Sequence, residues 1–190
     1  MPSTSPSTTA ATTSLAAAGS TPGSAIASPH AYDAGLLLLR VAFGLTMAAH
    51  GSQKLFGWFG GGGIDGTAKF FDSTGYPAAK AMAVVAGLTE FGGGLALAVG
   101  LLAPLAAAAI LGTMLNALAV SWNGNFFAMK DGAEYELILI AGAAALALTG
   151  PGRYAVDRYL PVVREHRLSY GAGAVVLGLV TAGVVLLVRS

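Results

Sequence analysis

The sequence predicts an all-α membrane protein built as a bundle of transmembrane helices. Charged residues make up 10% of the chain, hydrophobic residues make up 55%, and the mean hydropathy is +0.69. In an ordinary soluble domain about a quarter of the residues are charged. Five apolar segments follow one another along the chain. At about 20 residues per crossing, a chain of 190 residues holds four or five spanning helices and no separate soluble domain.

The first 30 residues differ from the rest of the chain. They are almost wholly Ser, Thr, Ala, Pro and Gly and contain no Lys, Arg, Asp or Glu, which predicts a disordered tail rather than a signal peptide. The net charge of +1 gives no reason to expect nucleic acid as a partner. The chain has no cysteine, which excludes a disulfide, a thiolate metal site and a redox thiol.

Arg40, His50 and Lys54 lie in the first apolar segment, residues 33–55. A charged side chain near the bilayer centre costs roughly 2.5–3.5 kcal/mol even on the lower scales. Arg40 is therefore expected to face the bundle and to have a partner, unless it snorkels to the interface. At about 100° per residue, Arg40 and Lys54 fall on one stripe of the helix, and His50 lies beside that stripe.

Glu90 is the expected partner of Arg40. It is the only acid in the second segment, residues 77–101, and small residues on its face would let another helix approach closely. Such a pair would either fix the register of the helices or belong to a polar cavity inside the bundle, and the sequence leaves both open. Asn116 is the one strongly polar interior residue of the third segment, residues 104–123.

Tyr135 and Glu136 stand near the start of the fourth segment, "EYELILIAGAAALALTG". The part after Glu136 is about 20 Å long as a helix, which is shorter than a hydrocarbon core of about 30 Å. The helix is therefore expected to begin near Asp131 and to include Glu134 and Glu136, and Gly and Pro in "GPGRYAVD" end it. The fifth segment, residues 171–188, is uncharged and gives the plainest spanning signal.

Arginines in the connection between residues 150 and 170 predict the orientation. This connection contains Arg153, Arg158, Arg164 and Arg167. The positive-inside rule places it in the cytoplasm, and counting back four helices places the N-terminus there too. The opposing residues are Lys54, Lys69, Lys80 and Lys130. We therefore expect a multi-pass protein of the cell membrane with a cytoplasmic N-terminus.

Phe56, Trp58 and Phe59 follow Lys54 where the first helix leaves the membrane. They would either line a ligand site or form an interfacial aromatic belt, which is the commoner role of such residues. The glycines after them are not a phosphate-binding loop, because no strand precedes them and no Lys-Ser or Lys-Thr pair follows. His50 is the only histidine within an apolar segment, so bis-histidine haem ligation and a metal site are not expected.

Three stretches together resemble the DoxX family of small bacterial integral membrane proteins: "LLLLRVAFGLTMAAHGSQKLFGWFGG", "GLTEFGGGLALAVGLLAPLAA" and "YELILIAGAAALALTGPGRYAVD". The resemblance covers about residues 34–160. It implies a four-helix membrane domain over residues 31–160, to which residues 161–190 add a loop and a fifth transmembrane helix. The residues that match the family's polar positions are Arg40, His50, Lys54 and Glu90, with Tyr135 and Glu136 behind them.

The resemblance also implies a redox-linked function. Similar proteins include the membrane subunits of thiosulfate:quinone oxidoreductase and of actinobacterial membrane complexes that join a superoxide dismutase to a sulfurtransferase. The function expected is that of a membrane subunit linked to quinone chemistry or to oxidative stress, and the cofactor stays open. If the chain is an enzyme subunit, its cavity holds a quinone, with His50 or Lys54 as a hydrogen-bond donor and Glu90 as a proton relay. The expected partners are the lipid bilayer and soluble enzymes of these two kinds. The alternatives are a noncatalytic anchor for soluble redox enzymes and a small-molecule transporter. No residue is assigned a catalytic role.

Overall fold

The computed structural model describes residues 28–161, 163 and 165–189, and these residues form helices and connecting segments without a strand. The predicted N-terminal tail lies outside the described residues as far as residue 27. The elements in chain order are α1 (Pro29–Phe56), η1 (Trp58–Gly60), α2 (Gly63–Ser73), α3 (Ala79–Val99), α4 (Ala103–Ser121), η2 (Ala128–Lys130), α5 (Glu134–Thr149), η3 (Val156–Tyr159) and α6 (Leu168–Leu187). The predicted all-helical fold is therefore confirmed.

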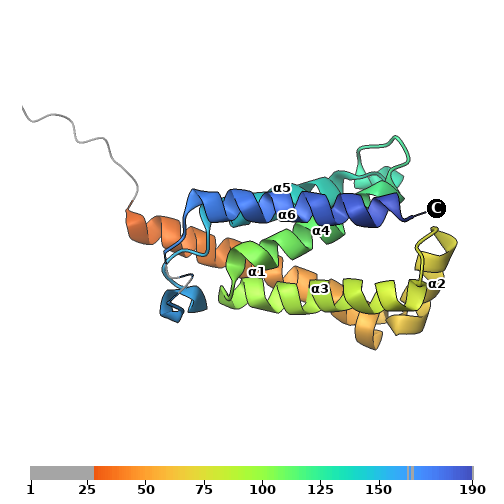
Figure 1. Ribbon diagram of the computed structural model, residues 1–190, viewed down its shortest axis with the longest axis horizontal. Helices are drawn as coiled ribbons and strands as arrows, with labels where there is room; N and C mark the ends of the chain where they lie inside the picture. Colours follow the sequence, from red (N-terminus) through yellow and green to blue (C-terminus); the bar gives the residue numbers. More distant parts are fainter. Residues whose placement is uncertain (1–27, 162, 164, 190) are drawn as a thin grey trace, which may run out of the picture.

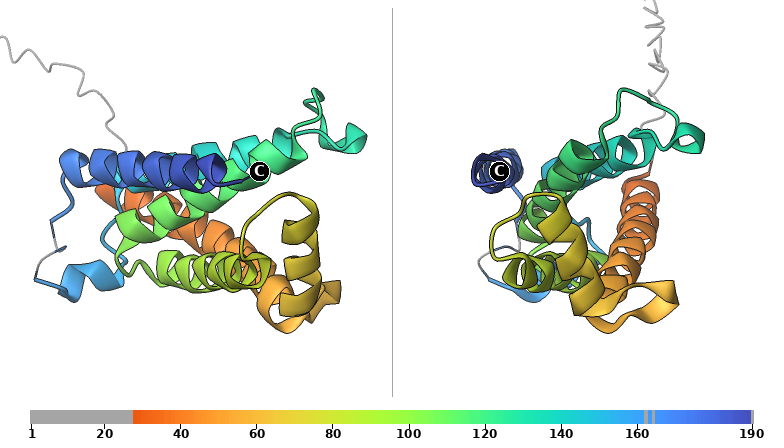
Figure 2. Two further views of the ribbon diagram at one scale, coloured as in Figure 1. Left: turned by 45° about the vertical axis from the view of Figure 1, so that its right-hand side comes forward. Right: turned by 90° about the vertical axis from the view of Figure 1, so that its right-hand side faces the viewer.

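The long helices form two groups that meet at one end of the bundle and diverge toward the other. One group is α1 packed along α3, and the other is α4 packed against α5 and α6. A short turn joins α3 to α4, and from this turn α4 runs diagonally away from α3 toward α5 and α6 (Figure 1). The two groups are consequently farther apart at the end that carries α2, as a second direction of view also shows (Figure 2).

The two ends of the bundle carry different segments. The arginine end, named for Arg153, Arg158 and Arg167, holds the start of α1, the α3–α4 turn and η3 (Figure 1). The α2 end holds α2, η1, η2 and the end of α6. The start of α1 and the connection after α5 therefore share one end, and α6 ends at the opposite one. This is the arrangement expected when five long segments run back and forth along the bundle.

Four of the described helices, α1, α3, α4 and α6, are long and apolar enough to cross a membrane. With 16 residues, or about 24 Å, α5 is shorter than the hydrocarbon core. It begins at Glu134, so the prediction of a start near Asp131 is wrong. Asp131 has a left-handed backbone with φ of 53° and follows η2, so the chain turns there before the helix begins. Glu134 and Glu136 do lie in the first turn of α5, as predicted.

One further boundary and one additional helix differ from the prediction. α1 begins at Pro29 rather than at Asp33, because proline is well accepted in the first turn of a helix. α2 was not predicted at all, since its 11 residues are too few to cross a membrane and include two glycines. It packs against α3 and α1 at the widened end of the bundle.

Glycines let α1 and α3 approach closely. A Cβ atom on Gly44 would collide with the carbonyl oxygen of Gly94, and one on Gly51 would collide with the backbone of Phe91. The buried face of α1 is the predicted stripe that starts at Arg40 and passes through these two glycines. Small residues thus fix which part of α1 lies beside which part of α3.

Candidate functional site: a polar cavity between the helix groups

Lys54 and Glu90 form an ion pair between α1 and α3. Lys54 Nζ lies 2.6 Å from Glu90 Oε2. Because Gly51 packs against Phe91, the last turns of α1 lie beside the middle of α3, and the lysine reaches the carboxylate from there. The exposed fraction is 27% for the lysine side chain and 1% for the glutamate. The pair therefore places a charge-assisted hydrogen bond inside the bundle, with the lysine side chain only partly buried.

Arg40 does not pair with Glu90, so that prediction is wrong. Arg40 lies eleven residues before Gly51, which is roughly 16 Å along α1, whereas Glu90 is level with Gly51. The Arg40 side chain is instead buried at the arginine end, where its Nη2 donates a hydrogen bond to the carbonyl oxygen of Tyr154. The carboxylate of Asp157 supplies an attractive opposite charge there.

Asp157 is a buried residue that the sequence did not single out. Its carboxylate oxygens accept hydrogen bonds from the backbone N–H groups of Leu102, at 2.6 Å, and Ala103, at 2.9 Å. These donors lie at the start of α4, where backbone N–H groups lack partners within the helix and an anion is favoured. Arg40 and Asp157 thus hold the connection after α5 onto the α3–α4 turn, which is a structural role. In the sequence Asp157 is the one acid in "GPGRYAVD", and no pattern there indicates which groups it contacts.

His50 and Tyr135 form a second polar pair, between α1 and α5. The Tyr135 hydroxyl and His50 Nε2 are hydrogen-bonded at 2.6 Å, and the two ring centroids are 5.7 Å apart. His50 lies one helical turn before Lys54 on α1, so the two pairs are close in depth. A tyrosine hydroxyl and an imidazole nitrogen can each donate or accept a hydrogen bond, so a proton can pass between them.

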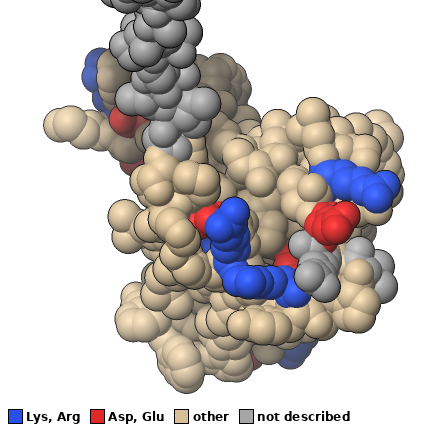
Figure 3. Space-filling view, turned by 90° about the vertical axis from the view of Figure 1, so that its left-hand side faces the viewer, with Lys and Arg blue, Asp and Glu red and all other residues tan. Residues whose placement is uncertain are grey.

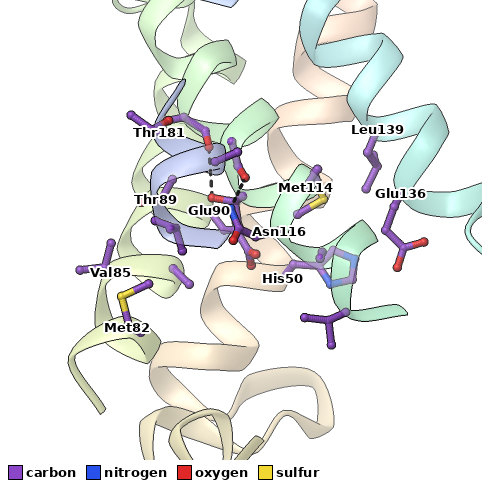
Figure 4. Close-up of a pocket in the computed structure, with 18 of the residues that line it drawn as sticks. His50, Met82, Val85, Thr89, Glu90, Met114, Asn116, Glu136, Leu139 and Thr181 are labelled. Carbon is purple, nitrogen blue, oxygen red and sulfur yellow. Dashed lines mark hydrogen bonds between the residues drawn. The ribbon is translucent and has the colours of Figure 1, made fainter. Parts of the chain in front are cut away.

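Both pairs face one cavity of about 850 Å³, which lies where the two helix groups diverge. The structure brings these predicted site residues together in its lining: His50, Lys54, Glu90, Asn116, Tyr135 and Glu136. Arg40 is not part of the lining. In the close-up, His50 and Glu136 lie on one side of the cavity, and Glu90 and Asn116 lie between them and Thr181 of α6 (Figure 4).

The three aromatic residues that follow Lys54 do not line the cavity. Phe56, Trp58 and Phe59 are exposed by 51%, 55% and 74%, and none of them lines the cavity. They lie on the outer surface at the α2 end, which fits the alternative of an interfacial belt. Besides Tyr135, the aromatic lining comes from Phe70, Phe71 and Tyr76. The difference arises because α2, which carries the two phenylalanines, was not predicted.

Tyr76 lines the cavity near α2. Its hydroxyl donates a hydrogen bond to Asn116 Oδ1 at 3.2 Å, and the guanidinium carbon of Arg189 lies 5.5 Å from the centroid of its ring. Burial raises the pKa of Tyr76 above its ordinary value, and the charge of Arg189 opposes this shift. The hydroxyl therefore stays protonated at neutral pH and remains a donor.

Comparison with known proteins assigns the family. The DoxX family model matches residues 35–122. The chain is 31% identical over 131 residues to the inner membrane protein YqjF of Escherichia coli (strain K12), a comparison that covers 67% of this chain and 93% of that protein. The chain belongs to the DoxX family. It is also 32% identical over 133 residues to the Bacillus subtilis (strain 168) protein named "Putative oxidoreductase CatD". This aligned region covers 68% of this chain and 89% of that protein. No solved structure matches the chain.

The membership confirms the resemblance and makes this chain a DoxX-family membrane protein. Within the described part of the chain, no three His, Asp or Glu side chains are placed to hold a metal ion. The polar groups of the cavity are an ammonium, carboxylates, an imidazole, an amide, phenolic hydroxyls and the hydroxyls of threonine and serine, among mostly apolar walls. Such a site can hold a mostly apolar molecule through a few hydrogen bonds and can pass protons to or from it.

Proposed function

We propose that this DoxX-family protein is a redox-linked membrane subunit that binds a quinone-class ligand in its cavity. The observation that carries the proposal is that two hydrogen-bonded pairs, Lys54–Glu90 and His50–Tyr135, face the same cavity. A quinone is a flat apolar ring with carbonyl oxygens that accept hydrogen bonds, so it requires donors in an apolar pocket. The volume of about 850 Å³ falls in the range of about 300–1,000 Å³ that small-molecule sites occupy.

The residues of the two pairs have distinct roles in this proposal. The Lys54 ammonium and the Tyr135 hydroxyl donate hydrogen bonds to the carbonyl oxygens of the ligand. When a quinone is reduced, each carbonyl oxygen takes up a proton as electrons arrive. A protonated His50 donates through Nε2 to the Tyr135 hydroxyl and can replace the proton that Tyr135 gives up. Glu90 is a carboxylate that accepts a hydrogen bond from Lys54, so it first takes up a proton from water and then passes it to the neutral amine that Lys54 has become.

The electrons come from a reductant on a partner protein in this proposal. The chain has no cysteine, so thiol chemistry would belong to the partner. The name of the Bacillus subtilis relative supports a link to oxidoreductases. Soluble redox enzymes, such as the superoxide dismutase and the sulfurtransferase implied by the resemblance, are the partners we propose to test first by co-purification in mild detergent.

We further propose that the protein lies in the cell membrane with its arginine end in the cytoplasm. The Escherichia coli relative is named as an inner membrane protein. Figure 3 looks onto the arginine end, where basic side chains are grouped with a few acidic ones on an otherwise uncharged surface. Arg153, Arg158 and Arg167 belong to this end, and loop arginines favour the cytoplasmic side.

Ligand binding is tested by fluorescence of Trp122, which becomes the only tryptophan after Trp58→Phe. Trp122 directly follows cavity-lining residues of α4. A tail-less methylated benzoquinone should quench its fluorescence saturably. Combined His50→Ala and Lys54→Ala substitutions should weaken binding by at least about tenfold, or about 1.4 kcal/mol.

The matched control is Lys80→Met, which removes a lysine that is 73% exposed and does not line the cavity. This variant should bind the benzoquinone as the parent does. Circular dichroism and gel filtration establish that each variant is folded. Quenching that does not saturate, or that is the same in the double variant and the parent, would contradict the quinone site and favour the noncatalytic anchor.

A further inference from the structure

The last long helix, α6, forms one wall of the cavity. Leu177, Thr181, Ala182 and Val185 of α6 line it, opposite residues of α3. α6 is packed against α4 and α5 but makes few contacts with α3. The packing against α4 is close, because a Cβ atom on Gly178 would lie 2.8 Å from the carbonyl oxygen of Ala108. α6 is therefore fixed on the α4 side and separated from α3 by the cavity.

The polarity of the cavity changes from one side to the other. The charged groups and the histidine come from α1, α5 and the inner face of α3, whereas the side toward α6 is apolar or weakly polar. Figure 4 shows Val85, Thr89 and Thr181 on the opposite side of Glu90 from His50. The Thr181 hydroxyl donates to the carbonyl oxygen of Leu177 at 2.9 Å, so its polar atom is satisfied within its own helix.

The apolar side of the cavity reaches the outer surface of the bundle. Val85 of α3 and Leu177 of α6 both line the cavity, yet they are 56% and 47% exposed. They belong to helices long and apolar enough to cross a membrane, so the surface that they share is one that lipid would cover. On the apolar side these two residues, at once cavity-lining and exposed, mark a lateral mouth between α3 and α6. Phe70, Leu105 and Tyr135 are also lining and exposed, at other parts of the cavity wall.

Near α2, hydrogen bonds of Arg189 hold the C-terminal end of α6 in place beside this mouth. Arg189 Nε donates to the carbonyl oxygen of Thr74 at 2.8 Å, and Arg189 Nη1 donates to that of Ala119 at 3.3 Å. These bonds tie α6 to the segment after α2 and to the last turns of α4. The opening toward lipid is thus bounded by this tie and lies along the middle of α6.

From these observations we infer that the apolar tail of the ligand leaves the cavity between α3 and α6, so that α6 is part of the ligand site. This inference rests on the proposed quinone site, because it concerns the same cavity. The headgroup lies among Lys54, Glu90 and His50, and the tail passes Thr89 and Thr181 into the bilayer. Along this path a long apolar chain meets only apolar and weakly polar groups, whereas a path past the charged pairs would place it against strongly polar groups. The ligand class is therefore a quinone with a long alkyl or isoprenoid tail.

Two substitutions narrow the passage, and two neighbours serve as matched controls. Thr89→Phe on α3 and Thr181→Phe on α6 place a larger side chain in it. Leu88→Phe and Val184→Phe change exposed residues of the same helices that do not line the cavity. Two probes are titrated at a fixed detergent concentration: a tail-less methylated benzoquinone and the same headgroup with a decyl tail.

The passage variants should lose at least about tenfold in affinity for the decyl-tailed probe and change by less than about twofold for the tail-less probe. The control variants should bind both probes as the parent does. An equal loss for both probes, or no loss beyond the controls, would overturn the α3–α6 path while leaving the quinone site intact. Failure of the parent protein to bind either probe would instead overturn the proposed function itself.

A bilayer phospholipid is the competing occupant of the apolar side. Native mass spectrometry of the parent protein detects any lipid that remains bound after purification. Addition of the decyl-tailed quinone should displace such a lipid in the parent. A phospholipid that stays bound while the decyl-tailed quinone also binds would show that the passage belongs to lipid, and it would overturn the inference.

Discussion

The Lys54–Glu90 ion pair should be strongly coupled in stability. Removing one partner of a buried ion pair costs about 3–5 kcal/mol, because an unpaired charge remains. Glu90 is 1% exposed but Lys54 is 27% exposed, so only one of the two side chains is fully buried. We therefore predict that Lys54→Met lowers the free energy of unfolding by about 3 kcal/mol, near the lower limit of this range. Adding Glu90→Gln should recover about 2 kcal/mol of this loss, because no buried charge is then left unpaired.

The free energy of unfolding is measured by titrating the protein from mild detergent into dodecyl sulfate and following circular dichroism. The exposed pair Lys80–Asp65, at 3.0 Å with side chains 73% and 82% exposed, is the control. A double-mutant cycle on that pair should give a coupling below about 1 kcal/mol. The reasoning is refuted if the coupling between Lys54 and Glu90 is no larger than the coupling in the exposed pair.

Three further predictions concern the arginine end and the topology. Arg40→Leu and Asp157→Asn should show a coupling above about 1 kcal/mol in the same unfolding assay, and strictly additive losses would mean that the two residues do not interact. Gly100→Ala should lower the free energy of unfolding by more than about 1 kcal/mol, because Gly100 has φ of 72° and a Cβ atom would collide with Arg40 Nη1; an unchanged value would contradict this packing. In intact cells a membrane-impermeant thiol reagent should label Ser73→Cys but not Ser169→Cys, since these exposed residues lie at opposite ends of the bundle; the reverse pattern would contradict the orientation.

Hydropathy was sufficient to predict the all-helical membrane fold, because in lipid a single spanning segment satisfies its backbone hydrogen bonds only as a helix. The same argument does not apply to α2, which is short and lies beyond the ends of the long helices. Its position depends on packing against α3, and residue pattern alone does not encode that contact. Missing α2 led to the wrong aromatic lining, because Phe70 and Phe71 belong to this helix.

The polar residues of the cavity could be predicted individually, but their pairing could not. An ionisable or strongly polar residue inside an apolar segment is rare and costly, so Glu90 and Lys54 are each conspicuous in the sequence. Which residues meet depends on the axial offset between α1 and α3, and the contact of Gly51 with Phe91 sets that offset. Composition and spacing do not contain this offset, and so Arg40 was assigned the wrong partner.

Photoaffinity labelling with an azido-substituted quinone tests the central claim most directly, because it locates the headgroup. The protein is labelled in detergent, digested, and mapped by mass spectrometry, with and without excess unlabelled quinone. The account predicts competed labelling within residues 50–54 of α1 and residues 135–139 of α5. Labelling confined to the exposed aromatic residues 56–59, or labelling that unlabelled quinone does not reduce, would contradict a quinone site in this cavity.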